Sequence, residues 1–248
     1  MPEFMLETGE ALMKILVVDD SAVNRRSAEV TLVGHEVTIL GSYDDAMLCM
    51  WAAAFPDCVI ELLFAHKRPF PKNLSLDPAQ YQFEVVLLDL MLPASMEMLG
   101  QESRWDFRKK PLLPYGMVMA MVATKIPSVR EILVITATNH HDHPMSAALD
   151  HLREPFCVNG KRIHYVNSRF NRVEGITEVT KCPLCRGTGR DRYDSGKLRP
   201  KFSSDHPLAS CWRCRGCEGT GKSVRDGKNW GAALRQVLGV ESSEEKTE

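Results

Sequence analysis

Short apolar runs alternate with helix-compatible stretches over most of this chain, and two of the runs end in acidic residues. The five runs lie at 14–20, 35–40, 84–93, 130–136 and 161–167. Runs of this kind, bounded by polar residues, are typical of buried parallel strands. Helices are expected at 22–33, 43–55, 114–126, 143–152 and 229–239. The alternation predicts an α/β fold, in which helices cover both faces of a five-stranded parallel sheet.

Two long stretches interrupt this alternation. A proline-rich segment at 56–82 precedes the third run, and a polar segment at 94–113 follows it. Loops of this length in a compact domain are usually functional or mobile, and the residues here do not indicate a particular function. The charged tail at 241–248 is expected to be disordered.

Composition excludes several classes of protein. With 44% apolar residues and a net charge of −1, the chain is neither a disordered protein nor a polycation over its whole surface. The sequence contains no run of 18 apolar residues, so no membrane span is predicted. The first residues carry acids and no basic segment, so no secretory signal is predicted and a cytoplasmic location is expected. The eight cysteines are then expected to be thiols or metal ligands rather than disulfides.

Acidic residues end the first and third predicted strands. Asp19 and Asp20 end the first strand, Asp89 ends the third, and Thr136 ends the fourth. Because the carboxyl ends of parallel strands form one edge, the strand order 2-1-3-4-5 brings the three carboxylates together. Like charges this close require a proton or a cation, and a hard ion such as Mg²⁺ suits oxygen ligands.

The segments KILVVDDSAVNRR, VVLLDLMLP and ILVITA closely resemble the response-regulator receiver (CheY-like) domain. The resemblance implies a flavodoxin-like, doubly wound fold. It also implies that Asp19 and Asp20 hold Mg²⁺ together with Asp89 and the backbone carbonyl of Met91. Asp89 would accept a phosphoryl group from a histidine kinase or a phosphotransfer protein, and Thr136 would be the switch residue. The expected chemistry is limited to phosphoryl acceptance and self-dephosphorylation.

One residue of the receiver pattern is not found where the pattern places it. Receivers have a lysine at the end of the last strand, whereas the end of the run at 161–167 and the residues after it read YVNSRF. Arg169 is the candidate cation there, although a planar guanidinium is not equivalent to an ammonium. A phosphatase of the haloacid dehalogenase type is a weaker alternative, since that chemistry needs D-x-D and the acids here are adjacent.

A histidine-rich loop follows Thr136 in the sequence NHHDHPM. His140, His141 and His143 are candidate ligands in the same pocket, because histidine is a common metal ligand. The alternative interpretation is a polar turn that lines the pocket, with Asp142 capping the next helix.

One cysteine motif occurs twice, as KCPLCRGTGR at 181–190 and RCRGCEGTGK at 213–222. Two C-x-x-C turns can place four thiolates around one structural Zn²⁺. The predicted ligands are Cys182, Cys185, Cys214 and Cys217, with Cys211 as an alternative ligand. A redox-active cysteine pair is the rival interpretation. The repeat resembles the cysteine-rich zinc-binding region of DnaJ-type chaperones, with two repeats instead of four.

The cysteine segment is also basic. Residues 181–222 contain ten Lys or Arg and four acids, a formal charge of +6, which four thiolates and one Zn²⁺ would reduce to +4. Aromatic residues interleave with the bases, so the segment could bind nucleic acid or a protein partner. The predicted division is a receiver-like domain at 14–178, a zinc insertion at 179–224, the last helix within 225–240 and a tail.

Two functions are consistent with these features. The first is a receiver-like signalling protein with the zinc module as an output or docking element. The alternative is a degenerate receiver scaffold whose basic zinc module binds nucleic acid or a protein. No membrane partner is predicted.

Overall fold

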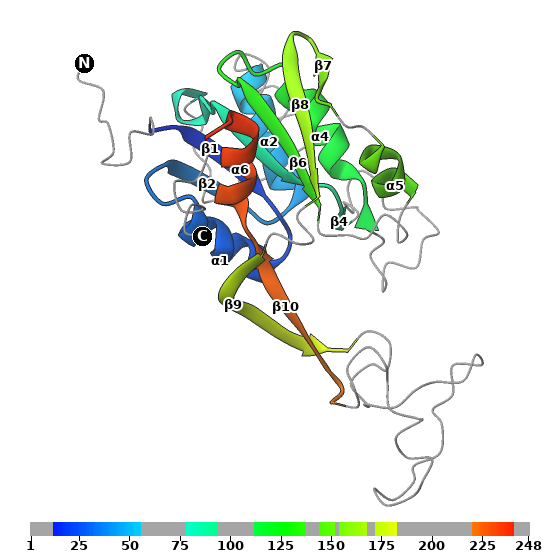
Figure 1. The fold of residues 1–248 in the computed structure, drawn as a ribbon. Helices are drawn as coiled ribbons and strands as arrows, with labels where there is room; N and C mark the ends of the chain where they lie inside the picture. Colours follow the sequence, from blue (N-terminus) through cyan, green and yellow to red (C-terminus); the bar gives the residue numbers. More distant parts are fainter. Residues whose placement is uncertain are drawn as a thin grey trace, which may run out of the picture. The chain divides into compact units, whose positions relative to one another are not determined.

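The structure is a computed structural model, and it describes residues 12–55, 78–93, 112–136, 144–151, 154–167, 172–182 and 220–240. The chain forms two compact units (Figure 1). Unit 1 comprises Met1–Val173 and Lys228–Glu248, and unit 2 comprises Glu174–Gly227. The predicted zinc insertion at 179–224 falls within unit 2.

Unit 1 is an α/β domain built on a mixed, mostly parallel sheet of six strands. Their order is β2-β1-β3-β6-β8-β7. The first five of these run parallel to their neighbours, and β7 is antiparallel to β8. The bounds are Glu36–Leu40 for β2, Lys14–Val18 for β1, Val85–Asp89 for β3, Glu131–Thr136 for β6, Lys161–Asn167 for β8 and Phe156–Val158 for β7.

The edge strand β7 corrects the expectation of a five-stranded, entirely parallel sheet. A two-residue turn of Asn159 and Gly160 joins it to β8, and both residues have positive φ angles, 51° and 74°. Asn-Gly is the preferred sequence for such a hairpin turn, because both residues tolerate positive φ. The short strand before the turn escaped the strand prediction, although the Asn-Gly signal was present.

The strands alternate their side chains between two cores. Leu16, Val18, Val86 and Leu88 belong to one core, with α2 (Tyr43–Ala54), α4 (Tyr115–Ala123) and α5 (Pro144–Asp150). Ile15, Val17, Val85 and Leu87 belong to the other, with α1 (Ala22–Thr31) and α6 (Trp230–Leu238). β1 and β3 are therefore buried on both faces, which explains their continuous apolar sequences.

The two ends of the segment that connects β3 to α4 pair with each other. Its ends pair as a short antiparallel ladder of β4 (Leu92–Pro93) and β5 (Leu112–Leu113). Before β3, a 3-10 helix at Pro78–Tyr81 precedes buried Phe83. The predicted insertions at 56–82 and 94–113 otherwise lie outside the described residues.

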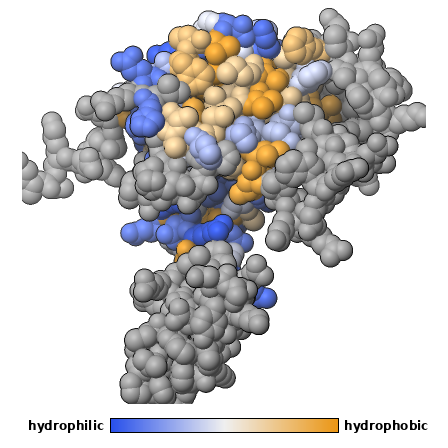
Figure 2. Space-filling model, turned by 90° about the vertical axis from the view of Figure 1, so that its right-hand side faces the viewer, coloured by the Kyte–Doolittle hydropathy of each residue, from blue (hydrophilic) through white to orange (hydrophobic). Residues whose placement is uncertain are grey.

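Helix α4 is amphipathic in its packing although it is apolar along its whole length. Met119, Ala120 and Ala123 are buried, whereas Val118 and Met121 are exposed. Figure 2 shows one face of the molecule, where apolar side chains reach the surface between hydrophilic ones. In the described part of the chain, no helix is both long enough and apolar enough to cross a membrane.

Unit 2 contains most of a two-stranded sheet formed by β9 (Arg172–Lys181) and β10 (Lys222–Lys228), whose outermost residues Arg172, Val173 and Lys228 belong to unit 1. The sheet ends where the Cys182 N–H donates to the Gly221 carbonyl at 2.9 Å. Val179 and Val224 are exposed, as expected for a ribbon with little core of its own.

Helices α1 and α6 approach closely at Gly231. A Cβ placed there would lie 2.1 Å from the Thr31 carbonyl oxygen, which is backbone and cannot rotate away. We expect Gly231→Ala to lower the free energy of unfolding by about 1–3 kcal/mol through overpacking. This loss would occur although Ala has a helix propensity better than Gly by about 1 kcal/mol.

Urea denaturation measures the effect. Gln236→Ala, at an exposed position of the same helix, is the control and should change stability by less than about 0.5 kcal/mol. A Gly231→Ala variant that is as stable as wild type would contradict the close packing of α1 against α6.

Candidate functional site

Three carboxylates meet at the carboxyl edge of the sheet, as predicted. Asp19 and Asp20 follow β1, and Asp89 is the last residue of the neighbouring strand β3. One oxygen from each of them can be chosen so that all lie within 4.8 Å of one another. Asp19 and Asp89 are buried, and Asp20 is half-buried.

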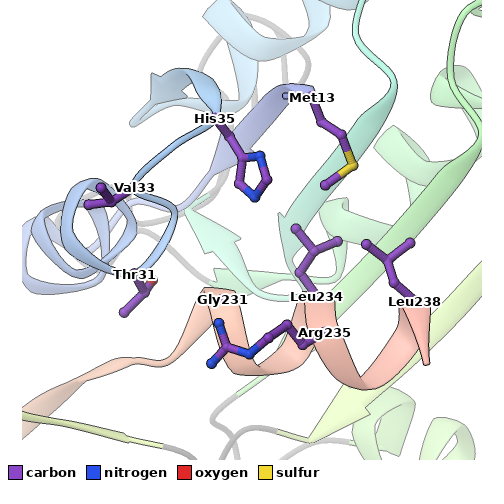
Figure 3. A pocket seen from close by; sticks show the side chains of 8 residues that line it. All are labelled: Met13, Thr31, Val33, His35, Gly231, Leu234, Arg235 and Leu238. Atoms are coloured by element: carbon purple, nitrogen blue, oxygen red, sulfur yellow. The ribbon is translucent and has the colours of Figure 1, made fainter. Parts of the chain in front are cut away.

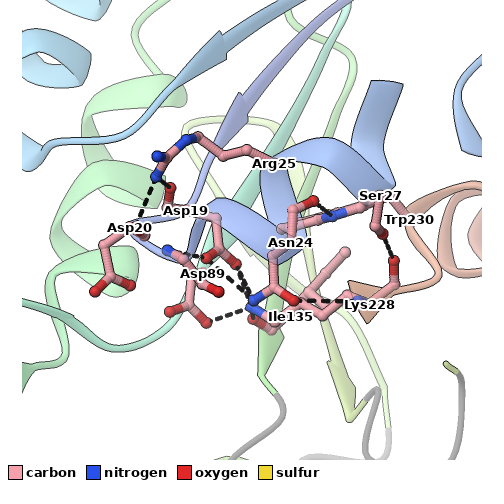
Figure 4. A network of polar contacts seen from close by, with 10 residues as sticks. Asp19, Asp20, Asn24, Arg25, Ser27, Asp89, Ile135, Lys228 and Trp230 are labelled. Carbon is pink, nitrogen blue, oxygen red and sulfur yellow. Dashed lines mark hydrogen bonds and ion pairs between the residues drawn. The ribbon is translucent and has the colours of Figure 1, made fainter. Parts of the chain in front are cut away.

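Lys228 supplies a cation to this cluster. Its Nζ lies 2.6 Å from Asp19 Oδ2 and 2.6 Å from Asp89 Oδ1, and it donates to the Ile135 carbonyl at 3.4 Å (Figure 4). The Lys228 side chain is only 2% exposed. A buried ammonium of this kind persists because its donors meet charged acceptors.

Asp19 is held in one orientation by its neighbours on the chain. Its Oδ1 accepts from the Ser21 N–H at 2.8 Å, and both its carboxylate oxygens accept from Asn24 Nδ2, at 3.1 and 3.0 Å. Arg25 Nη1 donates to the backbone carbonyls of Asp19 at 3.0 Å and Asp20 at 2.6 Å. The first turn of α1 therefore fixes the loop that carries both acids.

Helix α1 also holds the backbone of Lys228. The Lys228 N–H donates to Asn24 Oδ1 at 3.1 Å, and the Lys228 carbonyl accepts from the Ser27 hydroxyl. Trp230 Nε1 donates to the Asn24 carbonyl at 2.9 Å, and the Lys228 Nζ lies 5.0 Å from the Trp230 ring centroid. Asn24 thus contacts both the Asp19 carboxylate and the backbone N–H of Lys228.

The cluster holds more negative charge than Lys228 balances. Burial, opposed by Lys228 and reinforced by Asp19, raises the pKa of Asp89 above its ordinary value. Burial, followed by the charge of Asp19, raises the pKa of Asp20. Burial alone would lower the pKa of Lys228, but Asp19 and Asp89 together raise it. The site therefore favours a further cation or proton over three free carboxylates.

The donor set fits Mg²⁺. Mg²⁺ prefers carboxylate and water oxygens at about 2.1 Å. One oxygen from each of the three carboxylates lies within 4.8 Å of the others, so the three side chains could hold one metal ion. The three carboxylates and Lys228 carry a formal charge of −3 + 1 = −2, which matches a divalent cation.

The structure places two other predicted residues beside the cluster. Thr136 is fully buried at the end of β6, the strand next to β3. Met91 is 5% exposed and lies two residues after Asp89. Gly116, at the start of α4, donates its N–H to the Leu90 carbonyl at 3.1 Å, and a Cβ there would lie 2.3 Å from the Asp89 carbonyl oxygen. Helix α4 therefore begins directly against the acidic residue.

Several predicted site residues lie outside the described residues. They are Arg169, His140, His141, His143, Cys185, Cys211, Cys214 and Cys217. Cys182 is described and is 1% exposed at the end of the β9–β10 sheet.

Lys228 is the site residue that the sequence analysis missed. The receiver pattern predicts the cation directly after the strand at 161–167, where Arg169 is the candidate. Lys228 directly precedes the predicted helix at 229–239, but this position alone does not indicate which acids it contacts. Asn24 and Ser27, one turn apart on α1, were also missed.

Comparison with known proteins identifies no relative. No family model, no curated protein and no solved structure matches this chain. The case for a function therefore depends on the geometry of the site.

A small pocket of about 40 Å³ lies between the end of α1, the start of β2 and helix α6 (Figure 3). Thr31, His35 and Arg235 are among the residues that line it. None of its lining residues belongs to the acidic cluster, so it is separate from that site.

We expect Lys228→Met to destabilise the protein by about 3 kcal/mol, because it leaves buried carboxylates without their cation. Adding Mg²⁺ should recover more stability in this variant than in wild type, because its pocket is more negative. Urea denaturation in EDTA and in excess Mg²⁺ measures both effects.

Lys222→Met is the matched control, since it changes an exposed lysine on the same strand. It should leave stability and its Mg²⁺ dependence unchanged. If Lys228→Met behaves like Lys222→Met, the buried ion pairs do not contribute as described.

Proposed function

We propose that this chain is a receiver-like signalling protein with a flavodoxin-like unit 1 that accepts a phosphoryl group on Asp89. The observation that carries the proposal is Lys228, whose Nζ lies between Asp19 and Asp89 in a cluster of three carboxylates. An aspartate, acidic neighbours and a buried lysine at one sheet edge are the groups that phosphoryl acceptance requires. The receiver-like segments of the sequence support the same conclusion.

Asp89, Lys228 and Thr136 would have separate roles in the phosphoryl transfer. An oxygen of Asp89 attacks phosphorus, a phosphorus–oxygen bond forms, and the leaving group departs with the electron pair of the bond that breaks. Lys228, already 2.6 Å from Asp89 Oδ1, is placed to donate to a phosphoryl oxygen. Thr136, at the end of the adjacent strand β6, would donate its hydroxyl to another.

Asp19, Asp20 and Asp89, with the carbonyl of Met91, would hold Mg²⁺. When bound, the ion neutralises part of the negative charge of the phosphoryl group. Asn24 and Ser21 keep Asp19 oriented, and Arg25 keeps the loop of Asp20 in place. Hydrolysis of the acyl phosphate by water would return Asp89 to its starting state.

Incubation with acetyl phosphate and Mg²⁺ tests this function. Intact-mass spectrometry should show one added phosphoryl group on wild type and none on Asp89→Asn. Removing the cation with Lys228→Met should lower the phosphorylation rate by about 100-fold or more, since one charged contact to the transferring group is lost.

Glu29→Gln is the control, because Glu29 is an exposed acid on α1. It should be phosphorylated like wild type. An adduct that persists in Asp89→Asn would contradict phosphorylation of Asp89. No adduct on wild type would favour the alternative of an inert scaffold whose basic unit 2 binds nucleic acid or a protein.

We further propose that unit 2 holds a structural Zn²⁺ on Cys182, Cys185, Cys214 and Cys217. The pairing of Cys182 with Gly221 supports this, because Cys217 is four residues before Gly221 and therefore at most about 14 Å from it along the chain. The chain from Cys182 to Gly221, which contains both C-x-x-C motifs, thus starts and ends at one end of the β9–β10 sheet.

Native mass spectrometry and metal analysis of the purified protein should find one equivalent of zinc. Cys182→Ser should reduce zinc retention in the presence of a chelator at least about tenfold, because a thiolate ligand is lost. Cys157→Ser, at an exposed cysteine of unit 1, should retain zinc like wild type. Zinc below half an equivalent in wild type would contradict the site.

A further inference from the structure

Lys228 has a second position in the molecule besides its place in the acidic cluster. It is the last residue of β10, and it is the residue at which the chain leaves unit 2 and re-enters unit 1. The exposure of β10 changes at this point: Arg225 and Asp226 are exposed, and Gly227 and Lys228 are buried. The cation of the cluster is therefore also the anchor of the strand that leaves unit 2.

The chain after Lys228 is firmly held. Asn229 caps α6 by accepting from the Ala232 N–H at 2.9 Å, and Trp230 is fully buried. The contacts of Asn24 and Ser27 fix the backbone of Lys228 itself. We therefore expect a change in the contacts of Lys228 to affect the preceding residues of β10, which are exposed, more than the residues of α6 that follow it.

The contacts of Lys228 Nζ depend on the charge in the pocket. Two of its partners, Asp19 and Asp89, are the same carboxylates that would bind a divalent cation. A cation on these oxygens competes with the ammonium, whereas a phosphoryl group on Asp89 would offer it additional anionic oxygens. Adding a cation or a phosphoryl group to the pocket thus changes the strength of the Lys228 anchor in opposite directions.

We propose that Lys228 couples the acidic pocket to unit 2, so that the charge on Asp89 sets the stability of the β9–β10 sheet. The proposal rests on the proposed function in one respect, namely that phosphorylation of Asp89 is the natural input. The coupling itself requires only that Lys228 loses or gains anionic partners. Unit 2 is then the element that reports the state of the site.

Hydrogen exchange followed by mass spectrometry on the full chain tests the coupling without any phosphoryl chemistry. Asp89→Asn removes one charged partner of Lys228 and should accelerate amide exchange in 172–181 and 222–228 about tenfold, the effect expected from losing a charged hydrogen bond. Asp20→Asn is the matched control. It makes the same chemical change in the same cluster, but Lys228 Nζ donates to Asp19 and Asp89 and not to Asp20.

Comparison of amide exchange in the two variants decides whether the coupling exists. Faster exchange in β9–β10 for Asp89→Asn, with a much smaller effect for Asp20→Asn, supports the coupling. Equal acceleration in both variants indicates a general loss of stability and overturns it. Unchanged exchange in β9–β10 for Asp89→Asn also overturns it.

A second measurement uses wild type with Mg²⁺ and beryllofluoride, an analogue of the phosphoryl group. Binding should slow exchange in β9–β10 relative to Mg²⁺ alone, and Ser27→Ala should weaken this response because the Lys228 backbone loses one contact to α1. Slower exchange around Asp89 without any response in β9–β10 would overturn the coupling.

The outcomes for the function and for the coupling are separable. If acetyl phosphate and beryllofluoride both fail to react with wild type, the proposed function fails. The comparison of Asp89→Asn with Asp20→Asn still decides whether Lys228 transmits the charge of the pocket.

Discussion

The pair of contacts from Lys228 to Asp19 and Asp89 is the interaction on which the acidic site depends. Three carboxylates within 4.8 Å would repel one another at the buried edge of the sheet. One ammonium, 2.6 Å from two of them, offsets this repulsion and links the ends of β1 and β3 to the last residue of β10. Asn24 strengthens the junction because its amide bonds Asp19 and the Lys228 backbone together.

The same interaction bears on where unit 2 is inserted along the chain. Unit 2 begins after β8 and ends at Gly227, so the chain returns to unit 1 at the residue that the site needs. An insertion here leaves the parallel strands and their carboxyl ends intact. It also makes the last residue of β10 part of the site, which an insertion at any other loop would not do.

Local pattern was sufficient to predict most of the sheet and the acidic cluster. The run at 161–167 is β8 with the same bounds, and the acids after β1 and β3 converge because the two strands are parallel neighbours. Lys228 could not be placed by pattern alone, because its partners are 209 and 139 residues away in the sequence. Strand β7 and the β4–β5 ladder have three and two residues per strand, too few to show a period.

The separation of 209 residues between Asp19 and Lys228 has a consequence for the order in which the chain acquires its parts. A ribosome releases the three acids long before the lysine, so pairing of β1 with β3 before Lys228 is released would bring the acids together without their cation. Closing so long a loop costs conformational entropy that the contacts must first overcome. We therefore expect the acidic edge to be among the last parts of unit 1 to become native, and a chain truncated within unit 2 lacks the lysine.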